Sequence, residues 1–312
     1  FIKVQTGDYS KNTVSNVVQK INWGPSTLFW MGLAMIFVIG RDLFYIIRIR
    51  LLTHNSLSWK QGFRVIMLWE FASALSPGVV GGAAVAMFIL NKEGIKMGKA
   101  IAYVMVTAIF DNLFFVIGAP IILYFSQGNI FPESELLESQ VGSSLQALFW
   151  ISYALYASYS LLMALGLFYK PRAFKWILIK LFSIRFLRKW KSDAQEYGDQ
   201  IIEASKLLRG KNPSYWGKII GATIVVWSAR YLMLNFLIST WSGTMNLHQQ
   251  ISILSKQVIM WITLLISPSP GGAGFAEYFM GEIFGTSTFV ISATFVTSLT
   301  IIWRLFTYYA YL

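Results

Sequence analysis

Long apolar segments separated by short polar connections dominate the chain. The apolar segments cover residues 25–47, 63–90, 100–126, 147–169, 217–240, 249–267 and 287–312. Several are longer than the roughly 20 residues that a helix needs to cross the hydrocarbon core of a bilayer. Lipid offers the backbone no hydrogen-bond partners, so self-satisfied helices are expected, and the segments are too long for barrel strands. The pattern predicts a polytopic α-helical membrane protein.

Two breaks rich in proline and glycine interrupt the apolar pattern, at residues 76–82 (SPGVVGG) and 267–274 (SPSPGGAG). Asp111 follows Pro77 at the same spacing as Arg304 follows Pro270. Broken apolar segments in matching positions of two halves are typical of a transporter site between repeats. The backbone and hinge positions of the two breaks are Pro77, Gly78, Gly81, Gly82, Pro268, Pro270, Gly271, Gly272 and Gly274.

The charges of the connecting segments predict which side of the membrane each one faces. Residues 48–62 carry Arg48, Arg50 and Lys60, and residues 170–216 are rich in lysine and arginine, so both are expected in the cytoplasm. Residues 127–146 contain glutamates but no lysine or arginine, and are expected outside. Segment 63–90 must then begin and end on the inner side. At about 1.5 Å per residue it cannot cross a ~30 Å core twice, so we expect it to turn back at Pro77.

Counting membrane crossings in the same way predicts that residues 217–312 have the opposite orientation in the membrane. The expected fold is an all-α, polytopic transmembrane helical bundle with two inverted repeats, each containing a re-entrant helical hairpin broken at Pro-Gly. Residues 25–126 form the first repeat, 147–169 a linking helix, 170–216 a basic cytoplasmic amphipathic segment and 217–312 the inverted second repeat. All belong to one transmembrane domain, residues 1–312. The polar start, residues 1–24, indicates a fragment that lacks an N-terminal helix.

Composition narrows the function classes. Hydrophobic residues make up 55% of the chain and charged residues 13%, with a net charge of +12. The basic residues gather next to membrane segments, so the positive-inside rule explains them and nucleic acid is not an expected partner. With no cysteine and with His54 and His248 both in connecting segments, we expect no metal site and no cofactor. Residues 174–191 mix aromatic and basic side chains, which favours a helix on the anionic lipids of the inner leaflet.

Ionisable residues inside apolar segments are the candidates for a site, because they are costly in lipid and usually face a bundle interior or a wet cavity. Asp111, Arg230 and Arg304 lie well inside their spans. A pseudo-twofold axis between the repeats could bring Asp111 close to Arg304. Two interpretations stay open: a buried structural ion pair, or a polar cavity lined by both residues and Arg230 that admits a headgroup.

The breaks themselves could also bind an anion. A helix that starts after Pro-Gly inside the membrane presents free N–H groups and a positive dipole end, which favour phosphate; the alternative role of the glycines is close helix packing. Glu277, in the first turn of the second such helix, either complements the dipole, binds a cationic headgroup or exchanges protons. Glu70 is a further acidic candidate, and Arg41 is interpreted as an end-of-helix residue that reaches the interface.

Residues 268–277 (PSPGGAGFAE) resemble the P-x-P-G-G-x-G-x-x-E signature of the lysylphosphatidylglycerol synthase transmembrane-region family, a flippase-like membrane domain. Residues 77–82, the pair Asp111-Asn112 and Arg304 resemble other recurrent positions of that family, over nearly the whole chain. The chain departs from many members at Ala83-Ala84, where they carry a charged residue. The resemblance implies a domain that binds or moves phospholipid, and it adds Asn112 to the substrate-binding candidates.

The leading hypothesis is therefore a multi-pass protein of the plasma (inner) membrane that translocates a phospholipid, for example aminoacylated phosphatidylglycerol, between leaflets. The headgroup would occupy an interior cavity held by Arg304, Arg230 and the helix starts. We expect no enzymatic activity, since no catalytic constellation is visible. Two alternatives remain: an intramembrane enzyme acting on a lipid or polyprenyl phosphate with Asp111 or Glu277 as acid/base, and a non-transporting partner subunit. A homo-oligomer or a synthase partner is compatible with each.

Overall fold

The protein is a bundle of helices. The computed structural model describes residues 24–76, 80–126, 140–264, 267, 269–285 and 293–312, and every regular element in these ranges is helical. The elements are α2 (Pro25–Leu52), α3 (Trp59–Leu75), α4 (Val80–Lys92), α5 (Met97–Phe125), α6 (Gln140–Ala164), η1 (Leu165–Tyr169), α7 (Pro171–Leu181), η2 (Arg188–Trp190), α8 (Lys191–Leu208), α9 (Pro213–Ser242), α10 (Leu247–Leu264), α11 (Phe275–Gly285), α12 (Ala293–Thr307) and η3 (Tyr309–Tyr311).

Local sequence signals set the helix ends. Ser58 and Gln61 form a reciprocal capping box at the start of α3, and Asn212 caps α9 by accepting from the Tyr215 N–H at 2.9 Å. Proline occupies the first turn of α2, α7 and α9, where its missing N–H has no intrahelical partner to lose. Gly243 ends α9 with φ of +73°, a conformation that glycine adopts without strain.

Four helical stretches in the described chain are long and apolar enough to cross a membrane: Pro25–Leu52, Met97–Phe125, Gln146–Tyr169 and Pro213–Ser242. Many large apolar side chains on α2 and α6, such as Ile36, Ile39 and Leu155, are exposed, as expected where lipid is the solvent. The all-α, multi-pass membrane architecture is therefore confirmed. The inverted repeats and the re-entrant hairpins stay predictions.

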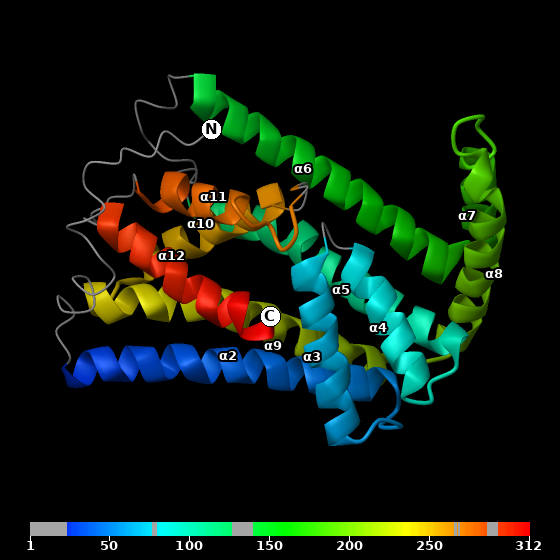
Figure 1. Ribbon diagram of the computed structural model, residues 1–312, viewed down its shortest axis with the longest axis horizontal. Helices are drawn as coiled ribbons and strands as arrows, with labels where there is room; N and C mark the ends of the chain where they lie inside the picture. Colours follow the sequence, from blue (N-terminus) through cyan, green and yellow to red (C-terminus); the bar gives the residue numbers. More distant parts are fainter. Residues whose placement is uncertain (1–23, 77–79, 127–139, 265–266, 268, 286–292) are drawn as a thin grey trace.

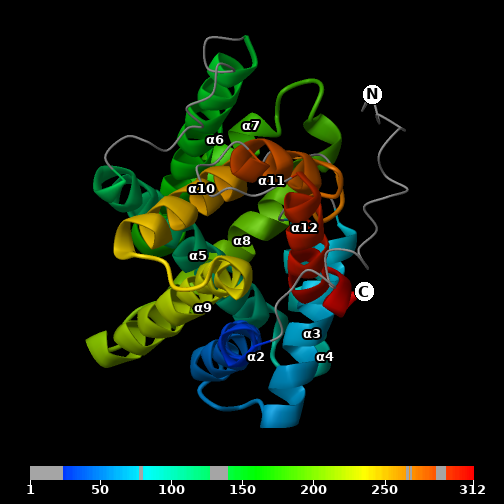
Figure 2. The same cartoon turned by 90° about the vertical axis from the view of Figure 1, so that its left-hand side faces the viewer.

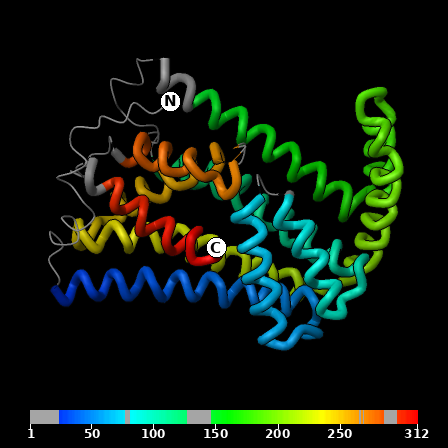
Figure 3. The backbone as a smooth tube through the Cα atoms, viewed as in Figure 1, coloured from blue at the N-terminus to red at the C-terminus, as the bar shows by residue number. Residues whose placement is uncertain are grey.

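The helices pack in a small number of close pairs (Figure 1). Helices α2 and α9 lie side by side over most of their length, and α12 lies next to α9 (Figures 1 and 2). Helices α3 and α4 run in opposite directions against each other, as the tube drawing shows (Figure 3). A Cβ atom at Gly81 or Gly82 would overlap the side chain of Ser76 or Ser73, so these glycines permit the close approach of α4 to α3.

Three connections gather at the end of the molecule where α7 and α8 cross the bundle: residues 53–58, 93–96 and 209–212 (Figure 1). His54 contacts Lys211, and Gly98 at the start of α5 lies against Glu203 of α8. The charge of residues 48–62 and 170–216 and the predicted turn within residues 63–90 predict one common side for all three connections. One boundary was wrong: α2 continues to Leu52, so Arg48 and Arg50 belong to this helix and not to the loop.

Candidate functional site

A cavity of about 280 Å³ lies inside the bundle, among α2, α3, α5, α9, α10 and α12, and charged and polar side chains interrupt its mainly apolar wall. The predicted site residues that line it are Glu70, Asp111, Asn112, Arg230, Gly271, Gly272 and Arg304. The predicted residues Gly81, Gly82, Pro270, Gly274 and Glu277 are not on its wall, although Glu277 contacts Arg304. Pro77, Gly78 and Pro268 lie outside the described residues. The cavity thus brings together side chains from both halves of the chain.

The described ends of the two breaks meet at one wall of this cavity. The Gly271 N–H points to the carbonyl oxygen of Ser76 at 3.5 Å, a long hydrogen bond. The Tyr308 hydroxyl donates to the carbonyl oxygen of Ala74 at 3.3 Å. The end of α3, which precedes the first break, therefore packs against the second break and the end of α12.

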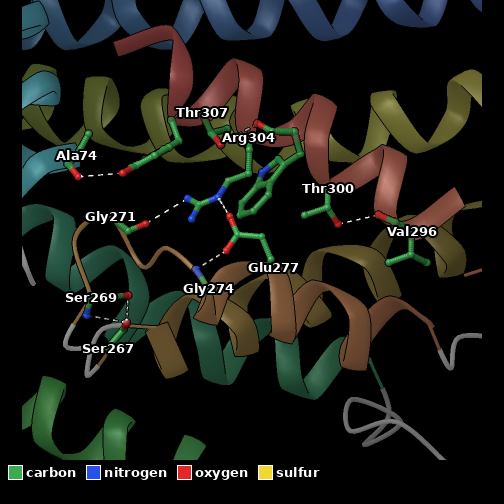
Figure 4. A network of polar contacts seen from close by, with 12 residues as sticks. Ala74, Ser267, Ser269, Gly271, Gly274, Glu277, Val296, Thr300, Arg304 and Thr307 are labelled. Carbon is green, nitrogen blue, oxygen red and sulfur yellow. Dashed lines mark hydrogen bonds and ion pairs between the residues drawn. The ribbon is translucent and has the colours of Figure 1, made fainter. Parts of the chain in front are cut away.

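Arg304 holds the second break in place (Figure 4). Its Nε donates to Glu277 Oε1 at 2.6 Å and its Nη1 donates to the carbonyl oxygen of Gly271 at 3.1 Å. The other carboxylate oxygen of Glu277 accepts from the Gly274 N–H at 2.6 Å, which caps α11. Of the roles left open for Glu277, the structure shows this capping role and adds the ion pair with Arg304. The Gly274 amide is consequently not free to bind an anion.

Gly271 can hold its place only because it lacks a side chain. Its φ of +55° lies in the left-handed region, and a Cβ atom would overlap the ring of Tyr308. Gly272 and Gly274 also have positive φ, of +68° and +83°. The glycines of the second break are therefore needed for the turn itself, and the carbonyl of Gly271 is turned toward Arg304.

Asp111 is held by Arg48, a residue that the sequence analysis placed in a loop. Arg48 Nη1 lies 2.5 Å from Asp111 Oδ1 and Nη2 lies 3.1 Å from Oδ2, so the pair is bidentate. Trp227 Nε1 donates to the same carboxylate at 2.8 Å, and Arg48 also donates to Thr223 Oγ1 at 3.1 Å. Only 2% of the Arg48 side chain is exposed, so this is a buried pair that joins α2, α5 and α9.

Of the two interpretations left open for Asp111 and Arg304, the structural ion pair between them is wrong: each pairs with a nearer partner, and both line the cavity. The interpretation of Arg41 as an interfacial residue was also wrong, because its side chain is 1% exposed and pairs with Asp42 at 2.8 Å. The helical spacing of Arg41, Tyr45 and Arg48 is the signal that could have found Arg48. All three fall on one face if the helix continues past residue 47.

Arg230 differs from the other two arginines of the cavity wall. Its Cζ lies 5.4 Å from the centroid of Trp227 and 5.0 Å from that of Trp261, so the guanidinium makes cation–π contacts with two neighbouring indole rings. Within the described part of the chain no carboxylate forms an ion pair with Arg230, nor any cation with Glu70. Arg230 and Glu70 thus lie on the same wall without a direct ion pair, although each feels the charge of the other.

Several buried donors of the cavity wall are also unsatisfied. Arg304 Nη2, Asn112 Nδ2, Trp261 Nε1 and Thr107 Oγ1 have no hydrogen-bond partner among the described residues. The Oδ1 atom of Asn112 is occupied, since it accepts from the Tyr156 hydroxyl at 2.5 Å. Buried polar groups without partners are rare in native proteins. All four donors belong to residues that line the cavity.

The chain is similar to known membrane proteins. Residues 6–312 match the family described as the lysylphosphatidylglycerol synthase TM region. Over 303 residues the chain is 23% identical to a UPF0104 membrane protein of Archaeoglobus fulgidus, covering 94% of this chain and 85% of the relative. No solved structure matches the chain.

Proposed function

Because the chain belongs to the family of the lysylphosphatidylglycerol synthase TM region, we propose that it binds a phospholipid in the central cavity and translocates it between bilayer leaflets. The observation that carries the proposal is Arg230, a cation of the cavity wall that has no carboxylate within ion-pair distance among the described residues and feels Glu70 only from farther away. A charged residue at such a position costs free energy unless a ligand or water compensates its charge. A lipid phosphate would supply that charge.

The other groups on the wall suit a phospholipid headgroup. Arg304, Asn112, Trp261 and Thr107 line the cavity and each has a donor without a partner among the described residues, so a rotation of these side chains toward the cavity would give hydrogen bonds to phosphate and glycerol oxygens. The Glu70 carboxylate, on the same wall, offers a partner to an amine. A headgroup with both charges, such as aminoacylated phosphatidylglycerol, is therefore the first candidate substrate to test. Exchange between leaflets would follow if one repeat rocked against the other around this fixed site.

We expect transport without catalysis. The two acids that could act in acid/base chemistry, Asp111 and Glu277, are each engaged by an arginine and by a further N–H donor. Their oxygen atoms are thus occupied by protein partners, which does not favour a direct role on a substrate. Conversion of a candidate lipid by purified protein would instead support the alternative of an intramembrane enzyme acting on a lipid or polyprenyl phosphate.

We also propose how the chain sits in the cell membrane. Placed in the plasma (inner) membrane, it would expose residues 53–58 and 170–216 to the cytoplasm. Helix α7 carries exposed Trp176, Ile177 and Leu181 next to basic residues, and Lys180 lies over the Trp176 ring at 4.8 Å. This face suits the anionic headgroups of the inner leaflet. The chain could act alone, as a homo-oligomer or with a synthase partner.

Translocation in reconstituted vesicles tests the proposal. The purified chain is inserted into vesicles that contain a labelled phospholipid in one leaflet, and the rate of its appearance in the other leaflet is measured. Arg230→Gln should reduce this rate by about tenfold or more, because it removes a charge-assisted contact to the phosphate. Arg64→Gln, which changes the same residue type in a surface ion pair with Glu93, serves as the matched control and should leave the rate unchanged.

The outcomes are distinct. Equal rates in Arg230→Gln and wild-type vesicles would remove Arg230 from the site. Equal rates in protein-containing and protein-free vesicles would contradict transport and leave the role of a non-transporting partner subunit, which co-purification with a larger complex would support.

A further inference from the structure

A second hollow lies away from the central cavity, where the α2–α3 connection meets the chain that leads into α9. Its volume is about 450 Å³ and none of its lining residues lines the central cavity. Polar and basic side chains form most of its wall: His54, Asn55, Lys211, Asn212, Tyr215 and Lys218. The size is in the range of small-ligand pockets, roughly 300–1,000 Å³.

The charge of this hollow is of one sign. Lys211 and Lys218 both line it, and none of its described lining residues is an aspartate or glutamate. Neither lysine forms an ion pair with a carboxylate anywhere in the described ranges. Exposed lysines usually have water or a nearby acid as partner; here two share a concave surface without a counter-charge. Such a surface concentrates anions.

His54 brings a third cationisable group into contact with the lysines. Its Nε2 lies 2.6 Å from Lys211 Nζ, so the neutral ring accepts from the ammonium, and its ring stacks on Tyr215 with centroids 5.2 Å apart. Burial, Lys211 and Lys99 together lower the pKa of His54 below its ordinary value. An anion in the hollow would offset the charge of the lysines and favour the protonated form of the His54 ring.

The loop that carries His54 is held in a specific conformation. His54 and Asn55 both have positive φ, of +53° and +58°, which is uncommon for residues other than glycine. The Asn55 N–H donates to the carbonyl oxygen of Arg50 at 2.7 Å, and the Ser56 hydroxyl donates to that of Thr53 at 2.6 Å. Uncommon backbone conformations that the surroundings hold in place are found preferentially at functional sites.

We propose that this hollow binds a phosphate group, held by Lys211 and Lys218 with His54 beside it. Lysine is a common phosphate ligand, and Asn212 already accepts from the first turn of α9, so the side chains rather than the helix start would provide the contacts. The phosphate could belong to the headgroup of a phospholipid or to a soluble phosphate compound. The site shares no residue with the headgroup cavity, so it stands whether or not the protein translocates lipid.

The test uses the full chain in a phosphate-free, non-ionic detergent, with its histidines labelled for NMR. The His54 signal is followed while inorganic phosphate is added in one arm and short-chain phosphatidylglycerol in the other, both at constant ionic strength. Substitution of His248 by asparagine identifies the His54 signal. A saturable shift is expected, together with a rise of the His54 pKa in the bound state. The groups that face His54 and enter this pH dependence are Lys211, Lys99 and Tyr215.

Two double variants test whether Lys211 and Lys218 hold the phosphate group. Lys211→Met with Lys218→Met should weaken the apparent affinity by about tenfold or more, since both charge-assisted contacts are lost. Lys60→Met with Lys206→Met removes the same charge from exposed positions outside the hollow and should bind as the wild type does. Saturation by inorganic phosphate points to a soluble ligand, and saturation by phosphatidylglycerol alone points to a lipid. No saturable shift in either arm, or the same affinity in both double variants, would overturn the proposal.

Discussion

Arg304 of α12 and Glu277 of α11 form an ion pair with 2.6 Å between Nε and Oε1. The same carboxylate caps α11 through the Gly274 N–H, and the same guanidinium reaches the carbonyl oxygen of Gly271. One arginine therefore fixes the break, the start of α11 and their distance from α12 (Figure 4). Arg230, by contrast, contacts two indole rings and has no anionic partner in the described chain.

This difference predicts that substitutions of the two arginines change the stability of the protein by different amounts. Arg304→Gln should lower the thermal midpoint of the detergent-solubilised protein, corresponding to about 1–3 kcal/mol, because it breaks the ion pair with Glu277 and the hydrogen bond to the carbonyl oxygen of Gly271. Arg230→Gln should leave the midpoint nearly unchanged. Glu277→Gln completes a double-mutant cycle with Arg304→Gln, for which we expect a coupling of about 1 kcal/mol. Strict additivity of the two substitutions would show that the pair contributes nothing to stability.

Gly271→Ala is expected to destabilise the protein by about 1–3 kcal/mol, since the added methyl group overlaps Tyr308 and the backbone is left-handed. Gly221→Ala is the matched control: it lies within α9 with nothing close to the position of a Cβ atom. There alanine should be neutral or slightly stabilising, because it favours the helix. The two thermal midpoints are compared in the same detergent. An equal change at both positions would argue against the tight turn at Gly271.

Asp111→Asn should be among the most destabilising substitutions in the chain. It leaves Arg48, which is 2% exposed, without its carboxylate, and removing one partner of a buried pair typically costs about 3–5 kcal/mol. The double variant Arg48→Met, Asp111→Leu should recover much of this loss, because no unpaired charge remains. Thermal midpoints of the three proteins give the answer. If the double variant is as unstable as Asp111→Asn or less stable, the buried charge is not the cause.

The sequence predicted the helical class and several charged residues that line the cavity. Asp111, Arg230 and Arg304 could be found because ionisable residues are rare in apolar spans and must face a bundle interior. Their positions in the chain, however, say nothing about how far each helix is rotated or which side chain is nearest. The partner of Asp111 is 63 residues away in α2, a separation that no helical period connects.

Arg48 was not predicted as a site residue because the apolar run falls off at residue 47. A basic residue at such a position is usually an interfacial anchor. The helix continues for one more turn, as far as Leu52, and this turn carries Arg48 into the bundle. Helix ends are the least certain part of a sequence-based assignment. Here the predicted end of the helix determined whether Arg48 was assigned to the loop or to the site.

His54 should titrate below the ordinary histidine value of 6.5 in the folded protein, because burial and the charges of Lys211 and Lys99 lower its pKa. Above about pH 6.5 the ring is neutral in both folded and unfolded chains and contributes no pH dependence. As pH falls through that value the unfolded chain takes up the proton first, so stability decreases until pH passes the folded pKa. Histidine NMR should show this titration, and Lys211→Met should raise the pKa. An unchanged pKa in Lys211→Met would contradict the contact.

The predicted orientation can be tested by labelling, because the chain contains no cysteine. Helix α9 has 30 residues and at ~1.5 Å per residue is long enough to cross a ~30 Å core, so its ends should face opposite sides. Cysteines introduced singly at the exposed positions Lys60, Lys206 and Thr244 report these sides. In intact cells an impermeant maleimide should label Thr244→Cys at once, and Lys60→Cys and Lys206→Cys only after permeabilisation. Labelling of all three from the same side would contradict the crossing, and the reverse pattern would invert the orientation that the loop charges predict.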